Sequence, residues 1–340
     1  MAAASLAVQR HGAALFAGSR NRARLLLSLL AQTLLVSLAA AEPLRIALSI
    51  TPLSLPFYVA QSQGYLAAEG LQVKITDVIG GHRTLQQVFD GNADLATSSE
   101  AVVMFNSFKR KDFAVIATFV TSDDDVRLVT RAGSGIVRPS QLAHKRVATV
   151  IGAASHYFLD TSLIFSGVDP KTVQTRNLQP EAMAEALEKG EVDAIAIWEP
   201  HPYQALTKIT DAAVLPKSGG YLLSFNLIIS KKLQGVRDDD LVKLLRALDR
   251  AQNFIEAEPV KAKAVLRDRL QADQKFMDYL WPRYKYRLSL NQSLLTTMEG
   301  QARWARQEGY VKSDQSPNYL DFIYAAPLRR VRAASVNIRD

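Results

Sequence analysis

The sequence lacks cysteine altogether, and it lacks the short motifs that mark several common classes of enzyme. Without cysteine there is no disulfide bond, no thiolate-bound metal and no cysteine nucleophile. Anchoring through a lipidated N-terminal cysteine is excluded as well. The patterns G-x-S-x-G, H-E-x-x-H and the phosphate-binding loop are also missing. The sequence therefore carries no local signature of serine hydrolysis, zinc proteolysis or phosphate-loop chemistry.

Glycine, proline and aromatic residues are modest in number, with 17 glycines, 13 prolines and 8% aromatics. These values exclude a collagen-like or proline-rich chain. A mean hydropathy near zero excludes a disordered chain. With 340 residues, of which 48% are hydrophobic and 22% charged, the composition suits a globular protein of one large or two medium domains.

The formal net charge of +8 is unevenly spread along the chain. Residues 1–41 contain four arginines and no acidic residue, and these arginines account for half of the net positive charge. The remaining positive charge is weak and dispersed, whereas nucleic-acid binding calls for a concentrated basic surface. We therefore expect no nucleic-acid partner.

Residues 1–41 have the layout of a secretory signal peptide. Arg20, Arg22 and Arg24 form a positive segment, an apolar run follows at residues 25–38, and three alanines at 39–41 precede Glu42. This order is typical of a signal with an A-x-A cleavage site. The apolar run is shorter than the roughly 20 residues that a membrane span needs, although an uncleaved anchor is the alternative. No second long apolar run follows, so we expect a periplasmic protein without stable membrane insertion after cleavage.

The rest of the sequence alternates short strands with helices, which predicts an α/β fold with largely parallel strands. The expected strands are 44–50, 71–78, 94–97, 113–120, 126–131, 146–151, 173–176, 193–197 and 221–230. The expected helices are 56–69, 84–89, a segment around 102–105 that Ser98 or Ser99 could cap, 155–166 and 180–189, and residues 238–309 are expected to be almost all helical.

Two small-residue segments suggest boundaries between lobes. Ala-Gly-Ser-Gly at 132–135 follows one expected strand, and Lys-Ser-Gly-Gly at 217–220 precedes another. We expect residues 134–220 to form a second lobe inserted into a first lobe made of 42–133 and 221–340. Because the chain then crosses twice between the lobes, the crossings would form a hinge.

An internal similarity supports two related lobes. Two segments repeat the order of helix, glycine turn, acidic residue, short apolar strand and polar residue. The matching pairs are Gly91 and Gly190, Asp94 and Asp193, and Glu100 and Glu199. In open α/β sheets ligands bind beyond the carboxyl ends of the strands. Ser98, Ser99 and Glu100 could therefore face Trp198 and Glu199, although the glycine and aspartate alone also fit an ordinary helix-to-strand connection.

In its order of motifs the sequence resembles the periplasmic substrate-binding proteins of ABC importers, in the branch for nitrate, sulfonates, taurine and thiamine-pyrimidine precursors. The matching stretches are 56–71, Gly80-Gly81, 91–96, 190–194 and 197–200. The resemblance implies a two-lobed, hinged type II periplasmic-binding fold with the ligand between the lobes. It also implies C-terminal helices that return to the first lobe, a monomer without catalysis, cofactor or metal, and delivery of a small solute to a permease and its ATPase.

Four strand-to-helix turns could present backbone N–H groups to a ligand, namely 54–57, 80–83, 97–99 and 152–155. Helix N-termini attract anions such as sulfonate or carboxylate. Glu100 and Glu199 would instead favour an amine or N–H donor, unless they serve as helix-dipole partners or surface ion pairs. Trp198 and Phe57 could cover a ring or alkyl chain, although Trp198 also suits lobe packing. The combination favours an aminosulfonate or an aminopyrimidine over bare nitrate.

These arguments and the resemblance give one set of expected ligand-binding residues: Pro56, Phe57, Gly81, His82, Ser98, Ser99, Glu100, Thr121, Ser155, His156, Tyr157, Trp198 and Glu199. His82, His156 and His201 lack the spacing of a metal site, so no metal is expected. The acidic run at 123–125 is interpreted as a solvated turn.

Three functions remain open from the sequence. The first is a solute-binding component of an ABC importer for a sulfonate or taurine-like solute, with an aminopyrimidine as the alternative ligand. The second is a periplasmic sensor subunit. The third is a pyrimidine-synthase-like enzyme, a resemblance that calls for a cysteine-rich motif absent here.

Overall fold

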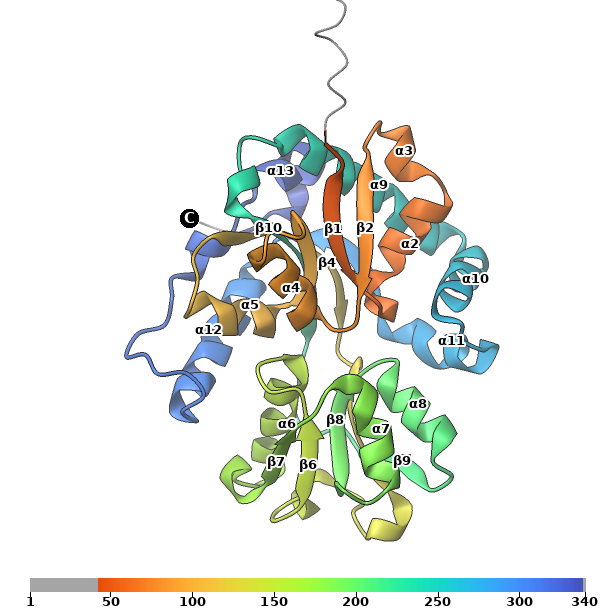
Figure 1. The fold of residues 1–340 in the computed structure, drawn as a ribbon, viewed down its shortest axis with the longest axis vertical. Helices are drawn as coiled ribbons and strands as arrows, with labels where there is room; N and C mark the ends of the chain where they lie inside the picture. The colour runs from red at the N-terminus through yellow and green to blue at the C-terminus, as the bar shows by residue number, and fades with distance from the viewer. Residues whose placement is uncertain (1–41, 339–340) are drawn as a thin grey trace, which may run out of the picture. The chain divides into compact units, whose positions relative to one another are not determined.

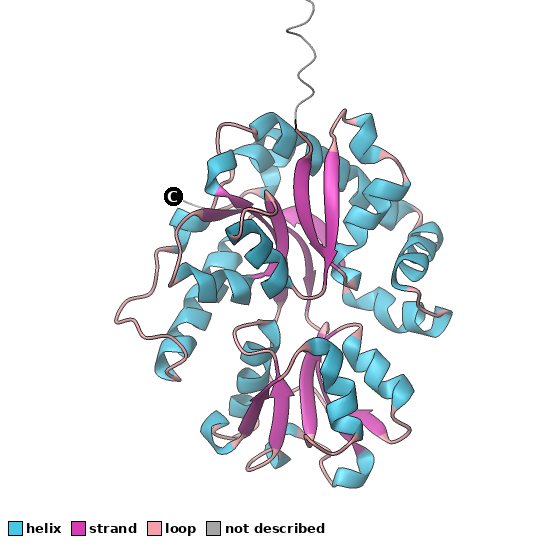
Figure 2. Ribbon diagram, viewed as in Figure 1, coloured by secondary structure: helices cyan, strands magenta, loops and turns pink. Residues whose placement is uncertain are grey.

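Two β-sheets organise residues 42–338, which are the residues that this computed structural model describes (Figure 1). Helices lie on both sides of the strands of each sheet (Figure 2). The expected α/β class, with mixed sheets flanked by helices, is confirmed. The expected signal peptide at 1–41 lies outside the described residues.

The first sheet has six strands in the order β11-β4-β10-β3-β1-β2. Strand β1 pairs in parallel with β2 and β3, whereas β10 runs antiparallel to both β3 and β4, and β11 runs antiparallel to β4. The strands are β1 (Leu44–Ser49), β2 (Val73–Val78), β3 (Leu95–Ser99), β4 (Phe113–Ser122), β10 (Leu223–Ser230) and β11 (Lys285–Ser289).

The second sheet has five strands in the order β7-β6-β8-β5-β9. Strand β6 pairs in parallel with β7 and β8, and β5 is antiparallel to β8 and β9. The strands are β5 (Val126–Arg131), β6 (Arg146–Thr149), β7 (Gln174–Asn177), β8 (Ala194–Trp198) and β9 (Ala212–Val214). The short buried strands β3 and β8 occupy equivalent places beside β1 and β6, respectively.

The acidic residues of the internal similarity hold these neighbouring strands together. Asp94, before β3, accepts hydrogen bonds from the backbone N–H and the guanidinium of Arg45 on β1. Asp193, before β8, accepts the same pair of bonds from Arg146 on β6. These aspartates therefore serve the sheets rather than a ligand.

Strand β5 bears on the expected boundary between the lobes. It lies in the segment expected to belong to the first lobe, but all of its hydrogen-bonded neighbours are in the second sheet. Pairing along a strand is decided by residues distant in the sequence, which the small-residue segment at 132–135 does not reveal. We propose that the first crossing lies between Ser122 and Val126, and the second between Val214 and Leu223.

Twelve helices accompany the strands within the described residues. They are α2 (Leu55–Ser62), α3 (Tyr65–Ala68), α4 (Gly81–Phe89), α5 (Glu100–Ser107), α6 (Ala154–Phe165), α7 (Pro180–Glu188), α8 (His201–Lys208), α9 (Asp238–Ala257), α10 (Pro259–Leu270), α11 (Gln274–Leu280), α12 (Gln292–Gln307) and α13 (Ala326–Arg332). The helix expected at 56–69 is divided into α2 and α3, because Gly64 adopts a left-handed conformation at φ 68°.

The C-terminal helices return to the first sheet, as the resemblance implied. Helix α9 packs against α2 and α3, α12 packs against α5, and α13 packs against α9 and β4. Strand β11 interrupts the region that was expected to be almost all helical. Its sequence, Lys-Tyr-Arg-Leu-Ser, alternates in polarity and pairs at a sheet edge with an irregular register. No helix within residues 42–338 combines the length and apolar character that a membrane span requires.

Candidate functional site

A cavity lies beyond the carboxyl ends of β1 and β3 of the first sheet and β8 of the second sheet. About 340 Å³ of space between its lining atoms is unfilled, including the part that is open to solvent. Only about 20 Å³ of it is open to the centre of a water-sized molecule, which is room for about one water, so a larger ligand requires the walls to move apart. The lining residues are Ser49, Thr51, Leu53, Gly81, His82, Ser99, Val102, Asp125, Ala153, Ala154, Trp198, Leu223 and Phe225.

Three helices begin at the wall of this cavity. Helix α4 contributes Gly81 and His82, α5 contributes Val102 after its cap Ser99, and α6 contributes Ala154. The first N–H groups of a helix have no partner within the helix and carry partial positive charge. No lysine or arginine is among the lining residues. Among the lining residues, positive partial charge is therefore supplied by the helix ends.

The start of α4 is held close to strand β3. The Ser98 hydroxyl donates a hydrogen bond of 2.7 Å to the carbonyl of Gly81, and the Thr84 hydroxyl lies 2.6 Å from the carbonyl of Thr97. A Cβ atom at Gly81 would lie 2.7 Å from Ser98 Oγ and 3.0 Å from its Cα. Only glycine lets this helix end approach the strand so closely.

Replacing Gly81 with alanine should therefore cost about 1–3 kcal/mol of unfolding free energy, because Ser98 and its strand must shift. Chemical denaturation measures this cost. Gly220→Ala is the matched control, since that glycine is exposed and a Cβ there meets nothing within 4 Å. Equal stability of the Gly81→Ala variant and the control would show that the close approach is not required.

His82, in the first turn of α4, and Trp198, at the end of β8, meet across the cavity. Their ring centroids lie 6.3 Å apart in an edge-on arrangement. Burial and the nearby Arg83 guanidinium lower the pKa of His82 to about 4, so the ring is neutral at physiological pH. Its buried Nδ1 has no hydrogen-bond partner among the described residues. The neutral ring can therefore offer a hydrogen-bonding nitrogen to a ligand.

Asp125 corrects the interpretation of the acidic run as a solvated turn. Its side chain is buried with 1% of its surface exposed, whereas Asp123 is exposed. The Tyr284 hydroxyl donates a hydrogen bond of 2.8 Å to Oδ1, and Oδ2 has no partner within the described residues. Burial raises the pKa of Asp125 to about 7, opposed by the Tyr284 bond and the Arg127 charge.

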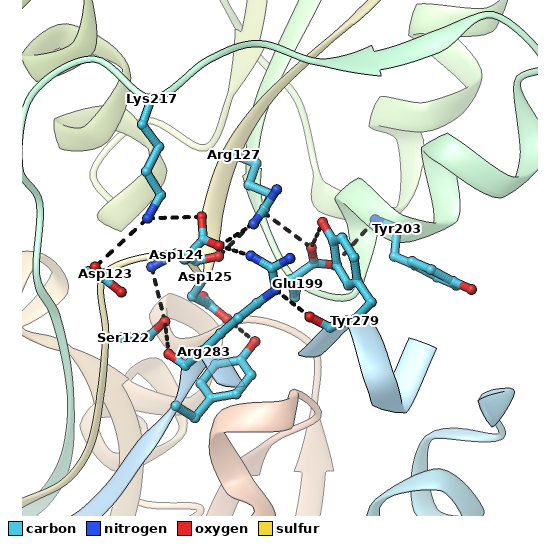
Figure 3. A network of polar contacts seen from close by, with 11 residues as sticks. Ser122, Asp123, Asp124, Asp125, Arg127, Glu199, Tyr203, Lys217, Tyr279 and Arg283 are labelled. Atoms are coloured by element: carbon cyan, nitrogen blue, oxygen red, sulfur yellow. Dashed lines mark hydrogen bonds and ion pairs between the residues drawn. The ribbon is translucent and has the colours of Figure 1, made fainter. Parts of the chain in front are cut away.

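Glu199 stands behind the cavity wall in a network of polar contacts between elements of both sheets (Figure 3). It accepts hydrogen bonds from the Tyr279 hydroxyl at 3.0 Å and the Tyr203 backbone N–H at 3.2 Å, and Arg127 Nε lies 3.8 Å away. Burial, reinforced by Asp125, raises the pKa of Glu199 to about 8. Its backbone carbonyl lies 3.4 Å from the hydroxyl of Thr51 on the cavity wall.

Glu100 lies in a different network, away from the cavity wall. It accepts hydrogen bonds from the Tyr221 hydroxyl at 2.6 Å, the Ser224 backbone N–H at 2.8 Å and Gln301 Nε2 at 2.9 Å. Burial raises its pKa. With both oxygens bonded, Glu100 joins α5 to β10 and α12 and leaves little capacity for a ligand.

Of the thirteen expected binding residues, four line the cavity: Gly81, His82, Ser99 and Trp198. The others lie in the surrounding structure. Ser98 and Glu199 support the wall as described above, whereas Glu100 joins α5 to β10 and α12 away from it. Pro56, Phe57, Thr121, Ser155, His156 and Tyr157 are not among the lining residues.

Packing explains most of these other positions. Phe57 is fully buried and packs edge-on against Phe119 with 5.7 Å between centroids. The Ser155 hydroxyl accepts a 2.8 Å hydrogen bond from Thr149 inside the second sheet. The His156 ring packs against Tyr310 at 4.3 Å and against Trp304 at 5.3 Å. The remaining three sit elsewhere: Pro56 in the buried first turn of α2, Tyr157 against Trp304 and Tyr221, and Thr121 on β4 beside β10 and β11.

Seven lining residues were absent from the expected set and from the expected turns: Ser49, Thr51, Leu53, Val102, Asp125, Leu223 and Phe225. Ala153 and Ala154 lie in the turn expected at 152–155. Among the described residues, no group of three or more histidines and carboxylates is placed to hold a metal ion.

Solved structures share this fold at low sequence identity. The alkanesulfonate-binding protein SsuA of Xanthomonas axonopodis pv. citri, solved with MOPS, aligns with a TM-score of 0.73 at 20% identity, covering 84% of this chain and all of that one. The desulfurization enzyme DSZB aligns with a TM-score of 0.59 at 14% identity, covering 85% and 99%. The fold therefore occurs in a binding protein and in an enzyme.

Sequence relatives and a family profile complete the comparison. The taurine-binding periplasmic protein of Escherichia coli (strain K12) is 35% identical over 65 residues, which are 19% of this chain and 20% of that protein. A Bacillus subtilis (strain 168) protein, named provisionally for binding aliphatic sulfonates, is 24% identical over 207 residues, or 58% and 60%. Both alignments span less than two thirds of the relative's length. The profile of the family described as NMT1/THI5 like matches residues 51–262, so the chain belongs to the NMT1/THI5-like family.

Proposed function

We propose that the protein is the solute-binding component of an ABC importer, and that it captures a small sulfonate or taurine-like solute in the periplasm. The observation that carries this proposal is the convergence of three helix N-termini on one small cavity. The family and the names of the relatives support the same class of ligand.

The cavity chemistry suits an anionic head on an organic body. Sulfonate oxygens accept hydrogen bonds from N–H groups at helix ends, which supply positive potential without a lysine or arginine on the wall. Most of the remaining wall is apolar, with Trp198 and Phe225 as its aromatic members. An apolar wall favours carbon over water, and nitrate has no carbon portion to gain from it.

Binding between the two sheets provides a means of delivery. Gly81, Ser99 and Leu53 come from the side of the first sheet, and Ala153, Ala154 and Trp198 come from the second. A ligand that touches both stabilises the closed arrangement over an open one, and a permease that recognises the closed arrangement then receives only loaded protein. Permease and ATPase subunits are the partners that this function requires.

An aminopyrimidine is the second candidate ligand. The edge-on pair of Trp198 and His82 can contact a flat ring, and the Asp125 carboxyl can accept from a ring amino group. This ligand uses the same aromatic wall but relies less on the helix ends.

The test is a thermal-shift panel on the purified protein with taurine, ethanesulfonate, 4-aminopyrimidine, nitrate and bicarbonate. A ligand at 100 times its Kd should add about 2.7 kcal/mol of stability. We expect the largest shift with an organic ligand, which chromatography then recovers unchanged. Shifts with nitrate or bicarbonate alone would refute the organic cargo, and conversion of the ligand would establish an enzyme on the same fold.

A further inference from the structure

The cavity wall contains one buried carboxyl group, that of Asp125, with a hydrogen bond to only one of its two oxygens. Asp125 lies between β4 and β5, is 1% exposed, and belongs to the cavity wall. Its Oδ1 is fixed by Tyr284, whereas its Oδ2 has no hydrogen-bond partner among the described residues. A buried acceptor without a partner costs free energy, so such groups call for an explanation.

The neighbouring carboxylates do not share this property. Both oxygens of Glu199 have partners, since Oε1 accepts from Tyr279 and Oε2 accepts from the Tyr203 backbone. Both oxygens of Glu100 are bonded as well. Neither glutamate is among the lining residues. Asp125 is therefore the carboxyl that a molecule in the cavity can reach.

Six titratable or charged groups interact electrostatically with Asp125. They are Arg127 on β5, Glu199 after β8, Tyr221 before β10, Tyr279 on α11, and Tyr284 and Tyr286 at β11. Burial raises the pKa of each of these four tyrosines, so they stay neutral near pH 7. Arg127 lies closer to Asp124 and Glu199, with which it forms ion pairs, and no ion pair joins it to Asp125.

Resting on the proposed function, we infer that Asp125 is the specificity-determining residue that receives an N–H donor of the ligand, so that the cargo carries an amino group. The helix ends hold the acceptor end of the molecule, and Asp125 holds the donor end. A neutral His82 offers a further nitrogen on the same wall. A simple alkanesulfonate would leave Asp125 buried without a partner, which disfavours it.

The test compares two pairs of ligands that differ only in the amino group: taurine with ethanesulfonate, and 4-aminopyrimidine with pyrimidine. Calorimetric titration of the purified protein gives each Kd. We expect the amino member of at least one pair to bind about ten- to a hundredfold more tightly, as a hydrogen bond to a charged group would provide. The preference should grow between pH 6 and pH 8, because Asp125 is ionised more fully as the pH passes its pKa of about 7.

Asp125→Asn should abolish the amino preference, while its Oδ1 keeps the hydrogen bond from Tyr284. Asp160→Asn is the matched control: Asp160 is also fully buried, accepts from Tyr310 at 2.9 Å, has one oxygen without a partner, and lies outside the cavity wall. The control should keep the preference. Melting temperatures of both variants separate lost folding from lost selectivity.

The outcomes separate this inference from the proposed function. If ligands of either pair bind but neither pair shows a preference for its amino member, the role of Asp125 is wrong while the function stands. An amino preference that survives Asp125→Asn likewise overturns it. If no member of either pair binds, the proposed class of cargo fails and the inference fails with it.

Discussion

Replacing Trp198 with alanine should weaken binding of the solute by roughly a hundredfold, the size expected when a buried aromatic contact at the centre of a site is removed. Trp198 ends β8, is only 8% exposed, and forms the wall that the second sheet places opposite His82. Its removal widens the cavity and withdraws the largest apolar surface from the ligand. Calorimetric titration with the best ligand of the panel measures the loss.

Trp304→Ala provides the control for a general loss of packing. Trp304 is buried to a similar extent, at 7% exposure, but it packs against His156 and Tyr310 and is not among the lining residues. The Trp304→Ala variant should have a lower melting temperature and a nearly unchanged Kd. The Trp198→Phe variant should retain most of the affinity. An unaltered Kd in the Trp198→Ala variant would contradict the assignment of the cavity.

Stability should fall by about 2 kcal/mol as the pH rises from 6.5 to 8, because Glu199 has a folded-state pKa of about 8. In this window the folded protein still holds the proton on Glu199, whereas the unfolded chain has lost it near its ordinary value of 4.5. The unfolded state therefore binds fewer protons, and the free energy of unfolding decreases with pH. Asp125, with its pKa of about 7, adds to the same slope.

Below pH 6.5 the free energy of unfolding should change less steeply with pH, because buried histidines shift it in the opposite direction. His82, His156 and His201 have pKa values of about 4 when folded, against 6.5 ordinarily, so the unfolded state binds more protons between these values. Urea denaturation at a series of pH values measures both regions. Glu199→Gln should remove most of the slope above pH 6.5, whereas Asp160→Asn, with a pKa of about 6, should leave it. Stability that rises from pH 6.5 to 8 would contradict the burial of these carboxyls.

Much of the fold could be predicted because its central strands are short apolar runs with clear ends. The expected strands at 94–97 and 193–197 match β3 and β8, and Ser99 caps α5 as expected. Strand β11 could not be predicted because its polar alternation lies between two helical segments. The sheet to which β5 belongs could not be predicted either, since its partner β8 follows more than sixty residues later in the chain.

The site was predictable where it depends on strand ends and less so elsewhere. Gly81, His82, Ser99 and Trp198 follow strands or begin helices, and the topology brings such positions together. Thr51 and Leu53 were missed because a short 3₁₀ helix, Pro52–Ser54, precedes α2, so the chain meets the cavity one turn earlier than expected. Asp125 was missed because three consecutive aspartates suggest solvent, whereas Tyr284, far along the sequence, buries the third.

A crystal structure with the ligand that gives the largest thermal shift would locate the binding site and its contacts. We expect the anionic or acceptor end of the ligand at the N-termini of α4, α5 and α6, its carbon portion against Trp198, and its amino group at Asp125. A ligand seated elsewhere, for example in the polar groove that contains Lys285 and Arg287, would contradict the assignment of this cavity as the binding site.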